Sequence, residues 1–279
     1  MRSVNEQSAA GKDKNMTASE KPDMLSTAQA MRYSRQLMLP AMDFRGQEAL
    51  LASKVLVIGM GGLGCAAAPY LVASGVGNIT LVDDDTVDSS NLQRQILYRE
   101  TDIGSCKAEQ AAASLTQLNS SINVTALCQR LTAEDLIEMV PQYSLVMDCT
   151  DNLASRNAIN AACVRAKVPL VSGAAIRFEG QVASFSMQGD EACYHCLSQL
   201  FGEQQLSCME AGILSPVVGI VGTMQALEAV KILADVGTPL YGKLQLFDAL
   251  SGQWQQFNLG KDPQCAVCSK LGHGQVEQG

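Results

Sequence analysis

The stretch Lys54-Val-Leu-Val-Ile-Gly-Met-Gly-Gly-Leu-Gly64 decides how the rest of the chain is interpreted. Its first five residues predict a buried β-strand, which runs directly into a glycine-rich turn. The small residues from Cys65 onward predict a helix that ends near Ser74-Gly75, and the next predicted strand, 78–82, stops at Asp83, 19 residues beyond Gly64. A strand, a glycine turn, a helix and a second strand that ends in an acid form the fingerprint of dinucleotide-binding folds.

Strands and helices continue to alternate toward the C-terminus. A helical spacing of apolar residues over 28–39 precedes the first strand, and further helices are predicted over 107–118, 133–140 and 154–167. Further strands are predicted over 123–127, 144–147 and 169–172. Near-alternation with glycines at 176–186 and 242–259 predicts antiparallel hairpins. We therefore expect an α/β fold of the Rossmann type, with a mixed, mostly parallel sheet, helices on both faces and antiparallel strands near the C-terminus.

The composition limits the classes of function. A chain of 279 residues with 47% hydrophobic residues can form one large α/β domain, expected over 24–270 between flexible tails at 1–23 and 271–279. A net charge of -8 argues against a broad grip on nucleic acid or on an anionic membrane. The N-terminus lacks the apolar core of a signal peptide, so a cytoplasmic location is expected. The longest apolar stretch, 213–236, is interrupted by charged residues and predicts a buried helix rather than a membrane span.

The glycine turn carries no lysine of its own. No Gly-Lys-Ser/Thr follows it, so basic residues elsewhere in the chain must bind the phosphates of a nucleotide. Candidates are Ser90-Asn-Leu-Gln-Arg-Gln95 and Lys107, which follow Asp83-Asp84-Asp85 near the carboxyl edge of the expected sheet. Arg94 can fork two phosphate oxygens, and Lys107 can add a point charge. The alternative is that both are solvated surface cations.

A second acidic segment, Asp148-Cys-Thr-Asp-Asn152, ends another predicted parallel strand. Magnesium prefers one or two carboxylates together with phosphate oxygens, so Asp151 is a candidate magnesium ligand at the same edge. The alternative is that Asp151 caps the helix expected to begin near Ser155.

Two CxxC pairs, Cys193-Tyr-His-Cys196 and Cys265-Ala-Val-Cys268, are the most specific local signal in the chain. Together they supply the four thiolates of a tetrahedral zinc site, with no position left for water, so the zinc is expected to be structural. His195 is interpreted as a spacer. The other six cysteines lack pair spacing, so the pattern favours a metal site over a disulfide framework. A redox dithiol is the alternative for either pair.

Cys208 has no partner at pair spacing and lies in a predicted loop. It is a candidate nucleophile, although neither a neighbouring cation nor a helix N-terminus that would lower its pKa is evident in the sequence.

Taken together, six separated elements resemble the MoeB/ThiF family of adenylyltransferases, which are relatives of the ubiquitin-activating enzymes. The elements are Arg32-Tyr-Ser-Arg-Gln36, Gly59-Met-Gly-Gly-Leu-Gly64, Ser90-Asn-Leu-Gln-Arg-Gln95, Asp148-Cys-Thr-Asp-Asn152, Ser172-Gly-Ala-Ala175 and the two CxxC pairs. The resemblance covers roughly 24–268. It implies that ATP and magnesium adenylate the C-terminal glycine carboxylate of a small ubiquitin-like sulfur-carrier protein that ends in Gly-Gly, with release of pyrophosphate. The segments 43–50, 198–202 and 209–212 look closer to the MoeB branch of molybdenum cofactor biosynthesis than to the ThiF branch of thiamine biosynthesis.

The resemblance also implies roles for individual residues. Gly62 would lie against the nucleotide, Asp83 would bind the ribose hydroxyls, and Asp151 would coordinate magnesium. The remaining residues of the implied ATP pocket are Ser90, Asn91, Leu92, Gln93, Arg94, Lys107 and Asn152. The cofactors would then be ATP, Mg²⁺ and Zn²⁺.

Arg35 matches the arginine that family members insert into the partner subunit's site, which implies a homodimer. Cys208 matches the family's sulfur-handling or thioester-forming cysteine. The sequence ends soon after the second CxxC pair, so a sulfur donor is expected to act in trans.

Three other functions remain open at this point. In a thiamine-type enzyme, Cys208 would form a persulfide link with the carrier. The glycine fingerprint alone would also fit a nicotinamide-dependent oxidoreductase, although no hydride-site residue is evident. A zinc-stapled scaffold without catalytic activity would bind zinc but would not adenylate a carrier.

Overall fold

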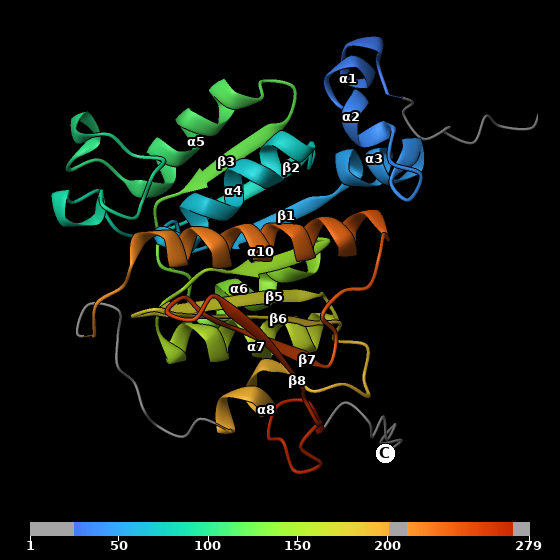
Figure 1. Cartoon of the computed structure of the whole chain (residues 1–279), viewed down its shortest axis with the longest axis vertical. Helices are drawn as coiled ribbons and strands as arrows, with labels where there is room; N and C mark the ends of the chain where they lie inside the picture. The colour runs from blue at the N-terminus through green and yellow to red at the C-terminus, as the bar shows by residue number, and fades with distance from the viewer. Residues whose placement is uncertain (1–24, 201–210, 270–279) are drawn as a thin grey trace, which may run out of the picture.

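The computed structural model describes residues 25–200 and 211–269, which form an eight-stranded sheet covered by helices (Figure 1). In space the strands lie in the order β3-β2-β1-β4-β5-β6-β7-β8. The first five of these are parallel, and β6, β7 and β8 are antiparallel. The strand bounds are β1 Lys54–Ile58, β2 Asn78–Val82, β3 Asn123–Leu127, β4 Leu145–Asp148, β5 Leu170–Ile176, β6 Glu179–Phe185, β7 Lys243–Asp248 and β8 Gln253–Asn258. This arrangement confirms the expected mixed, mostly parallel sheet.

Side-chain alternation along β1 divides the core into two layers. Val55 and Val57 belong to one buried cluster, whereas Leu56 and Ile58 belong to the other, because successive strand residues point to opposite faces. Helices that cover the first face are α3 (Asp43–Ala52), α4 (Gly62–Ser74), α5 (Lys107–Leu118) and α10 (Ser215–Ala234). Helices that cover the second are α6 (Ala133–Met139), α7 (Leu153–Ala166) and α8 (Tyr194–Gln199).

The single helix expected over 28–39 is divided in two, α1 (Thr27–Arg32) and α2 (Ser34–Leu37). The break is at Tyr33, which is 2% exposed although it lies in a surface segment. Its hydroxyl accepts a hydrogen bond from Asn119 Nδ2 at 2.9 Å, and its ring lies under Gly75. Burial of this ring turns the backbone away from a continuous helix, which local periodicity cannot reveal.

Among the residues that the structure describes, α10 is the one helix long and apolar enough to span a membrane. Half of its most apolar window is buried, and it packs on α4, β5 and β6. Its buried polar side chains have partners: Gln225 Nε2 donates to the Asp148 carbonyl at 2.8 Å, and Glu228 Oε2 accepts from Leu240 N at 2.6 Å. The packing confirms the expectation of a buried helix.

Candidate nucleotide and metal sites

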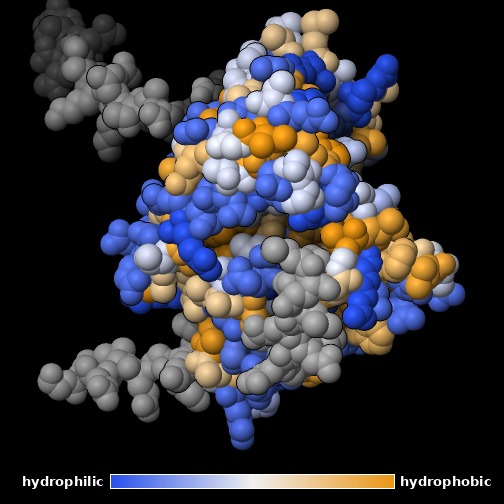
Figure 2. Space-filling model, turned by 90° about the vertical axis from the view of Figure 1, so that its left-hand side faces the viewer, coloured by the Kyte–Doolittle hydropathy of each residue, from blue (hydrophilic) through white to orange (hydrophobic). Residues whose placement is uncertain are grey.

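The carboxyl ends of β1, β2 and β4 bring most of the expected nucleotide-binding residues to one edge of the sheet. Ile58 is in register with Val82 on one side and with Asp148 on the other, so the chain leaves all three strands at the same level. Ligands of open α/β sheets bind outside this edge. Figure 2 views the molecule from this side, where hydrophilic residues border a recess.

The glycine turn between β1 and α4 is closely packed. Gly59 has φ 95°, and a Cβ at this position would lie 2.7 Å from the Cys149 carbonyl oxygen, so only glycine fits. Gly61 caps α4, and the nearest atom to a Cβ there would be Gln95 Nε2 at 3.8 Å. At Gly62, by contrast, a Cβ would lie 3.0 Å from Val218 Cγ2 of α10. The open approach to the helix N-terminus is therefore at Gly61, and the expected contact of Gly62 with the nucleotide stays a prediction.

Asp83, the acid expected to bind ribose, is held beside this turn. Its Oδ2 accepts from Met60 N at 2.7 Å, and its Oδ1 accepts from Asp85 N at 2.9 Å. Burial raises the pKa of Asp83, whereas the hydrogen bonds from the Asp85 and Met60 amides lower it in part. The carboxylate is thus fixed at the tip of β2, where it can accept hydrogen bonds from ribose hydroxyls.

Two cations lie in the connections that follow β2. Lys107, the first residue of α5, is 5% exposed, and its Nζ lies 2.8 Å from Asp85 Oδ2. Arg94 Nη1 donates to the Ser90 carbonyl at 3.2 Å, a contact that does not neutralise the guanidinium. Burial and pairing of Lys107 exclude the solvated-cation alternative for that residue. Both side chains carry charge that phosphate oxygens can share.

The segment 89–95 is held in place by contacts with α10 and with the core. A short 3-10 helix, Ser89–Asn91, is followed by Leu92, which packs on the core. The Ser215 hydroxyl at the start of α10 donates to Gln93 Oε1 at 2.7 Å. These contacts fix the residues on either side of Arg94, so its side chain starts from a defined position at the recess.

Between β4 and α7, the loop presents Asp151 to solvent. Asn152 Oδ1 accepts from Ser155 N at 2.9 Å and caps α7, so the cap is Asn152 and the capping alternative for Asp151 is wrong. The expected place of Asn152 in the nucleotide pocket stays a prediction. An exposed carboxylate at the phosphate-binding edge is the hard oxygen ligand that magnesium prefers, so Asp151 fits the ion.

Arg35 does not join the other cations within one chain. It belongs to α2, whose Gln36 donates to the carbonyl of Ser74 at 3.0 Å, at the end of α4 away from the glycine turn. The 13 residues of α4 span about 20 Å, so Arg35 lies on the opposite side of the domain from Gly61 (Figure 1). A role for Arg35 at a nucleotide therefore requires a second copy of the chain. Cys208, the remaining residue of the expected catalytic set, lies outside the described residues.

The four cysteines of the CxxC pairs meet in the second core layer. All four are buried, and their sulfur atoms lie 3.6–4.0 Å apart for Cys196–Cys268, Cys193–Cys265 and Cys193–Cys196. Four sulfurs at about 2.3 Å from a tetrahedral zinc would lie about 3.8 Å apart, so the residues fit this ion. The distances are too long for disulfides. The predicted zinc-binding set is thus assembled, and it joins α8 to the segment after β8.

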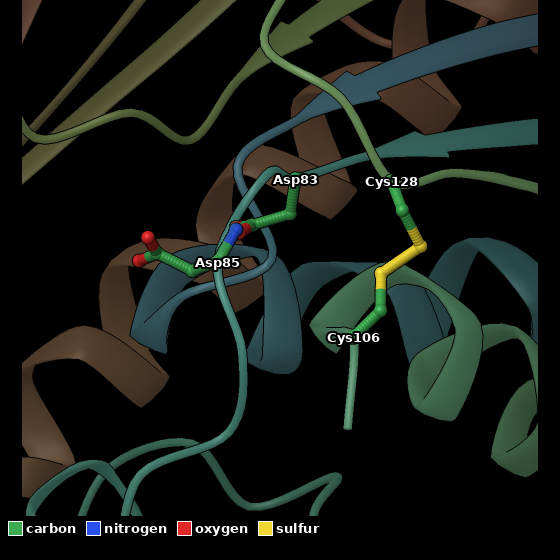
Figure 3. Close-up of a disulfide and its surroundings, with 4 residues drawn as sticks. All are labelled: Asp83, Asp85, Cys106 and Cys128. Atoms are coloured by element: carbon green, nitrogen blue, oxygen red, sulfur yellow. A yellow bond between two sulfur atoms is a disulfide. The ribbon is translucent and has the colours of Figure 1, made fainter. Parts of the chain in front are cut away.

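A disulfide that the sequence pattern does not predict joins Cys106 and Cys128, whose Cα atoms are 6.2 Å apart (Figure 3). Cys106 precedes the first residue of α5, and Cys128 follows the last residue of β3. The sequence pattern, which favours a metal site over a disulfide framework, does not predict this single bond, because the two residues share no short-range motif. Their positions at adjacent ends of a packed helix and strand were the one available signal.

We expect the Cys128→Ser substitution to lower the free energy of unfolding by about 3 kcal/mol, because the bond closes a loop with a sequence separation of 22. Urea unfolding in an oxidising buffer measures the difference. Dithiothreitol should remove it by reducing the parent protein, and identical unfolding midpoints in the oxidising buffer, with the disulfide verified by mass, would contradict the expectation.

Comparison with known proteins identifies the family of this chain. A family model described as the ThiF family matches residues 33–267. The chain belongs to the ThiF family. The match covers the glycine turn, the cation-bearing connections, the Asp151 loop and three of the four clustered cysteines, and it confirms the resemblance of the six sequence elements.

Two adenylyltransferases are similar to this chain over nearly their whole length. The chain is 50% identical over 246 residues to the molybdopterin-synthase adenylyltransferase of Escherichia coli strain K12, covering 88% of this chain and 99% of that one. It is 48% identical over 238 residues to the sulfur carrier protein ThiS adenylyltransferase of the same strain, covering 85% and 94%. The crystal structure of E. coli MccB with ATP matches with a TM-score of 0.75 at 26% identity, covering 85% of this chain and 73% of MccB.

Proposed function

We propose that this protein uses ATP and Mg²⁺ to adenylate the C-terminal glycine carboxylate of a small ubiquitin-like sulfur-carrier protein in molybdenum cofactor biosynthesis. The observation that carries the proposal is the meeting of Asp83, Lys107 and the open turn at Gly61 at one sheet edge. The chain also has 50% sequence identity to a molybdopterin-synthase adenylyltransferase over 99% of that protein.

In the proposed reaction, a carboxylate oxygen of the carrier attacks the α-phosphorus of ATP. The bond from that phosphorus to the bridging oxygen breaks, and its electron pair leaves with pyrophosphate, which gives an acyl-adenylate. Asp83 holds the ribose, and the N-terminus of α4 faces the phosphates. Arg94 and Lys107 neutralise charge that builds on the leaving pyrophosphate, and Asp151 would hold a magnesium ion, which would supply further positive charge to the phosphates. Orientation and charge neutralisation supply the acceleration.

The proposal also includes a second subunit, a zinc ion and a separate sulfur donor. Arg35 reaches a nucleotide in a homodimer, where it enters the partner's recess. Zinc at the four cysteines is structural and takes no part in the reaction. A separate protein donates sulfur to the adenylated carrier, and the protein acts in the cytoplasm.

A thiamine-type activity is the second candidate, because the chain is 48% identical to a ThiS adenylyltransferase over 94% of that protein. Replacing Cys208 by alanine separates the two candidates. Adenylation survives in both cases, whereas sulfur loading of the carrier collapses in the thiamine-type enzyme alone.

The test is carrier-dependent exchange of labelled pyrophosphate into ATP. The purified protein is incubated with a MoaD-like or a ThiS-like carrier, each matched by a variant that lacks its terminal glycine. We expect exchange with the intact MoaD-like carrier and background exchange with the truncated forms. Exchange with neither carrier would overturn adenylation, exchange with the ThiS-like carrier alone would overturn the pathway, and a thermal shift with NAD instead of ATP would favour an oxidoreductase.

A further inference from the structure

Arg156, on the first turns of α7, is a buried cation next to the proposed magnesium ligand. It is 8% exposed, and both its Nε at 3.3 Å and its Nη2 at 2.6 Å donate to the carbonyl oxygen of Thr150. Burial alone would lower the pKa of Arg156, but the charge of Asp148 and the side chain of Tyr194 raise it above its ordinary value. A charge buried at this cost has to make specific contacts, and these contacts are with the residue that precedes Asp151.

Thr150 is held at all three of its polar groups. Its amide and hydroxyl donate to Asp148 Oδ1 at 3.0 and 2.7 Å, and its carbonyl accepts from Arg156. Asp148 is itself fully buried, with Oδ2 accepting from Ser172 at 3.0 Å. On its other side, Asp151 is followed by the residue that caps α7. The backbone at Asp151 is therefore fixed from both directions while its carboxylate is exposed.

The same helix reaches the four-cysteine cluster one turn later. Asn160 is fully buried, its Oδ1 accepts from Tyr194 N at 2.9 Å, and its Nδ2 contacts Cys193 Sγ at 3.5 Å. Tyr194 also lies close enough to Arg156 for its side chain to help raise the Arg156 pKa. Arg156 and Asn160 are four residues apart and share one face of α7, so a continuous set of contacts joins the cysteine cluster to the Asp151 loop.

We propose that Arg156 is a positioning residue that orients Asp151 toward the metal of ATP·Mg²⁺, and that Tyr194 and Asn160 tie this orientation to the four-cysteine cluster. The inference rests on the proposed function and adds to it a residue that the nucleotide and the carrier do not touch. Arg156 acts through the Thr150 carbonyl. Its loss changes the metal requirement of the reaction more than the affinity for the nucleoside, which Asp83 and the glycine turn provide.

The main variant is Arg156→Lys, which keeps the charge but cannot fork onto the Thr150 carbonyl. Arg165→Lys is the matched control, because Arg165 lies on the same helix and is exposed. We expect Arg156→Lys to raise the Mg²⁺ concentration for half-maximal pyrophosphate exchange by about 10-fold or more, as when a residue that supports a metal ligand is lost. The KM for ATP measured at saturating Mg²⁺ should stay close to the parent value. Arg165→Lys should match the parent in both quantities.

A second measurement needs no carrier and no turnover. Mn²⁺ replaces Mg²⁺ as the probe, and its binding to the protein–ATP complex is followed by electron paramagnetic resonance. We expect weaker Mn²⁺ binding in Arg156→Lys than in Arg165→Lys, with equal zinc content in both. Equal Mn²⁺ binding would overturn the positioning role. Normal Mn²⁺ and ATP binding by a parent protein that fails to exchange pyrophosphate with any carrier would count against the proposed function alone.

Tyr194→Phe keeps the test decisive if Arg156→Lys does not fold. This variant removes the Tyr194 hydroxyl, which contributes to the raised pKa of Arg156, and keeps the ring, which packs edge-on against Phe185 at 6.3 Å between centroids. We expect its Mn²⁺ binding to weaken in the same direction as in Arg156→Lys, by a smaller factor. A parent-like Mn²⁺ response in Tyr194→Phe would overturn the link between the cysteine cluster and Asp151.

Discussion

Replacing Lys107 by alanine is expected to lower the rate of carrier-dependent pyrophosphate exchange by about 100-fold or more, the scale observed when one preorganised charge-stabilising group is removed. Lys107 is nearly buried at the start of α5, and its ammonium group lies 2.8 Å from Asp85. The substitution removes a cation from the phosphate-binding edge and leaves the Asp85 charge uncompensated beside the triphosphate. Both changes raise the energy of the transition state, in which negative charge accumulates on the leaving pyrophosphate.

Lys54→Ala is the matched control, because Lys54 is exposed at the amino end of β1, at the opposite end of the strand from the recess. Its exchange rate should equal that of the parent. Arg94→Ala should show a loss similar to that of Lys107→Ala. Near-normal exchange in either Arg94→Ala or Lys107→Ala would mean that ATP binds away from this edge, and the proposed site would be wrong.

Loss of the metal site is expected to have the largest effect on stability. Cys193→Ser removes one of four buried sulfurs that join α8 to the segment after β8. Zinc binding of this kind contributes several kcal/mol to folding, and each kcal/mol shifts the Tm of a domain this large by about 2–4 °C. We therefore expect the Tm to fall by on the order of 10 °C, measured by differential scanning calorimetry alongside zinc content.

Cys163→Ala provides the control for this measurement. Cys163 is also fully buried in the second core layer, but it lies outside the four-cysteine cluster. It should retain one zinc per chain and lose about 1 kcal/mol of stability from the small cavity that it leaves. If Cys193→Ser kept its zinc and the parent Tm, the cluster would not be a zinc site.

Much of the sheet could be predicted because its signals are local. The strands 54–58, 78–82 and 123–127 and the helix 107–118 have the bounds that the sequence predicts. Three of these four elements are followed directly by a glycine or a polar residue, namely Gly59, Asp83 and Asn119, and such neighbours mark where an element stops. The four-cysteine cluster could also be predicted from the two CxxC pairs, because two cysteines three residues apart can bind the same metal ion.

The sequence by itself thus determined the fold class, the glycine turn with Asp83 at the next strand end, and the set of four cysteines that cluster. The tertiary structure alone decided the bend at Tyr33, the Cys106–Cys128 bond, the pairing of Lys107 with Asp85, the separation of Arg35 from the recess, and the buried contacts of Arg156. Propensity, periodicity and capping depend on residues a few positions away. These other features depend on groups such as Tyr33 and Asn119, which are 86 residues apart and meet only when the whole sheet and its helices are packed.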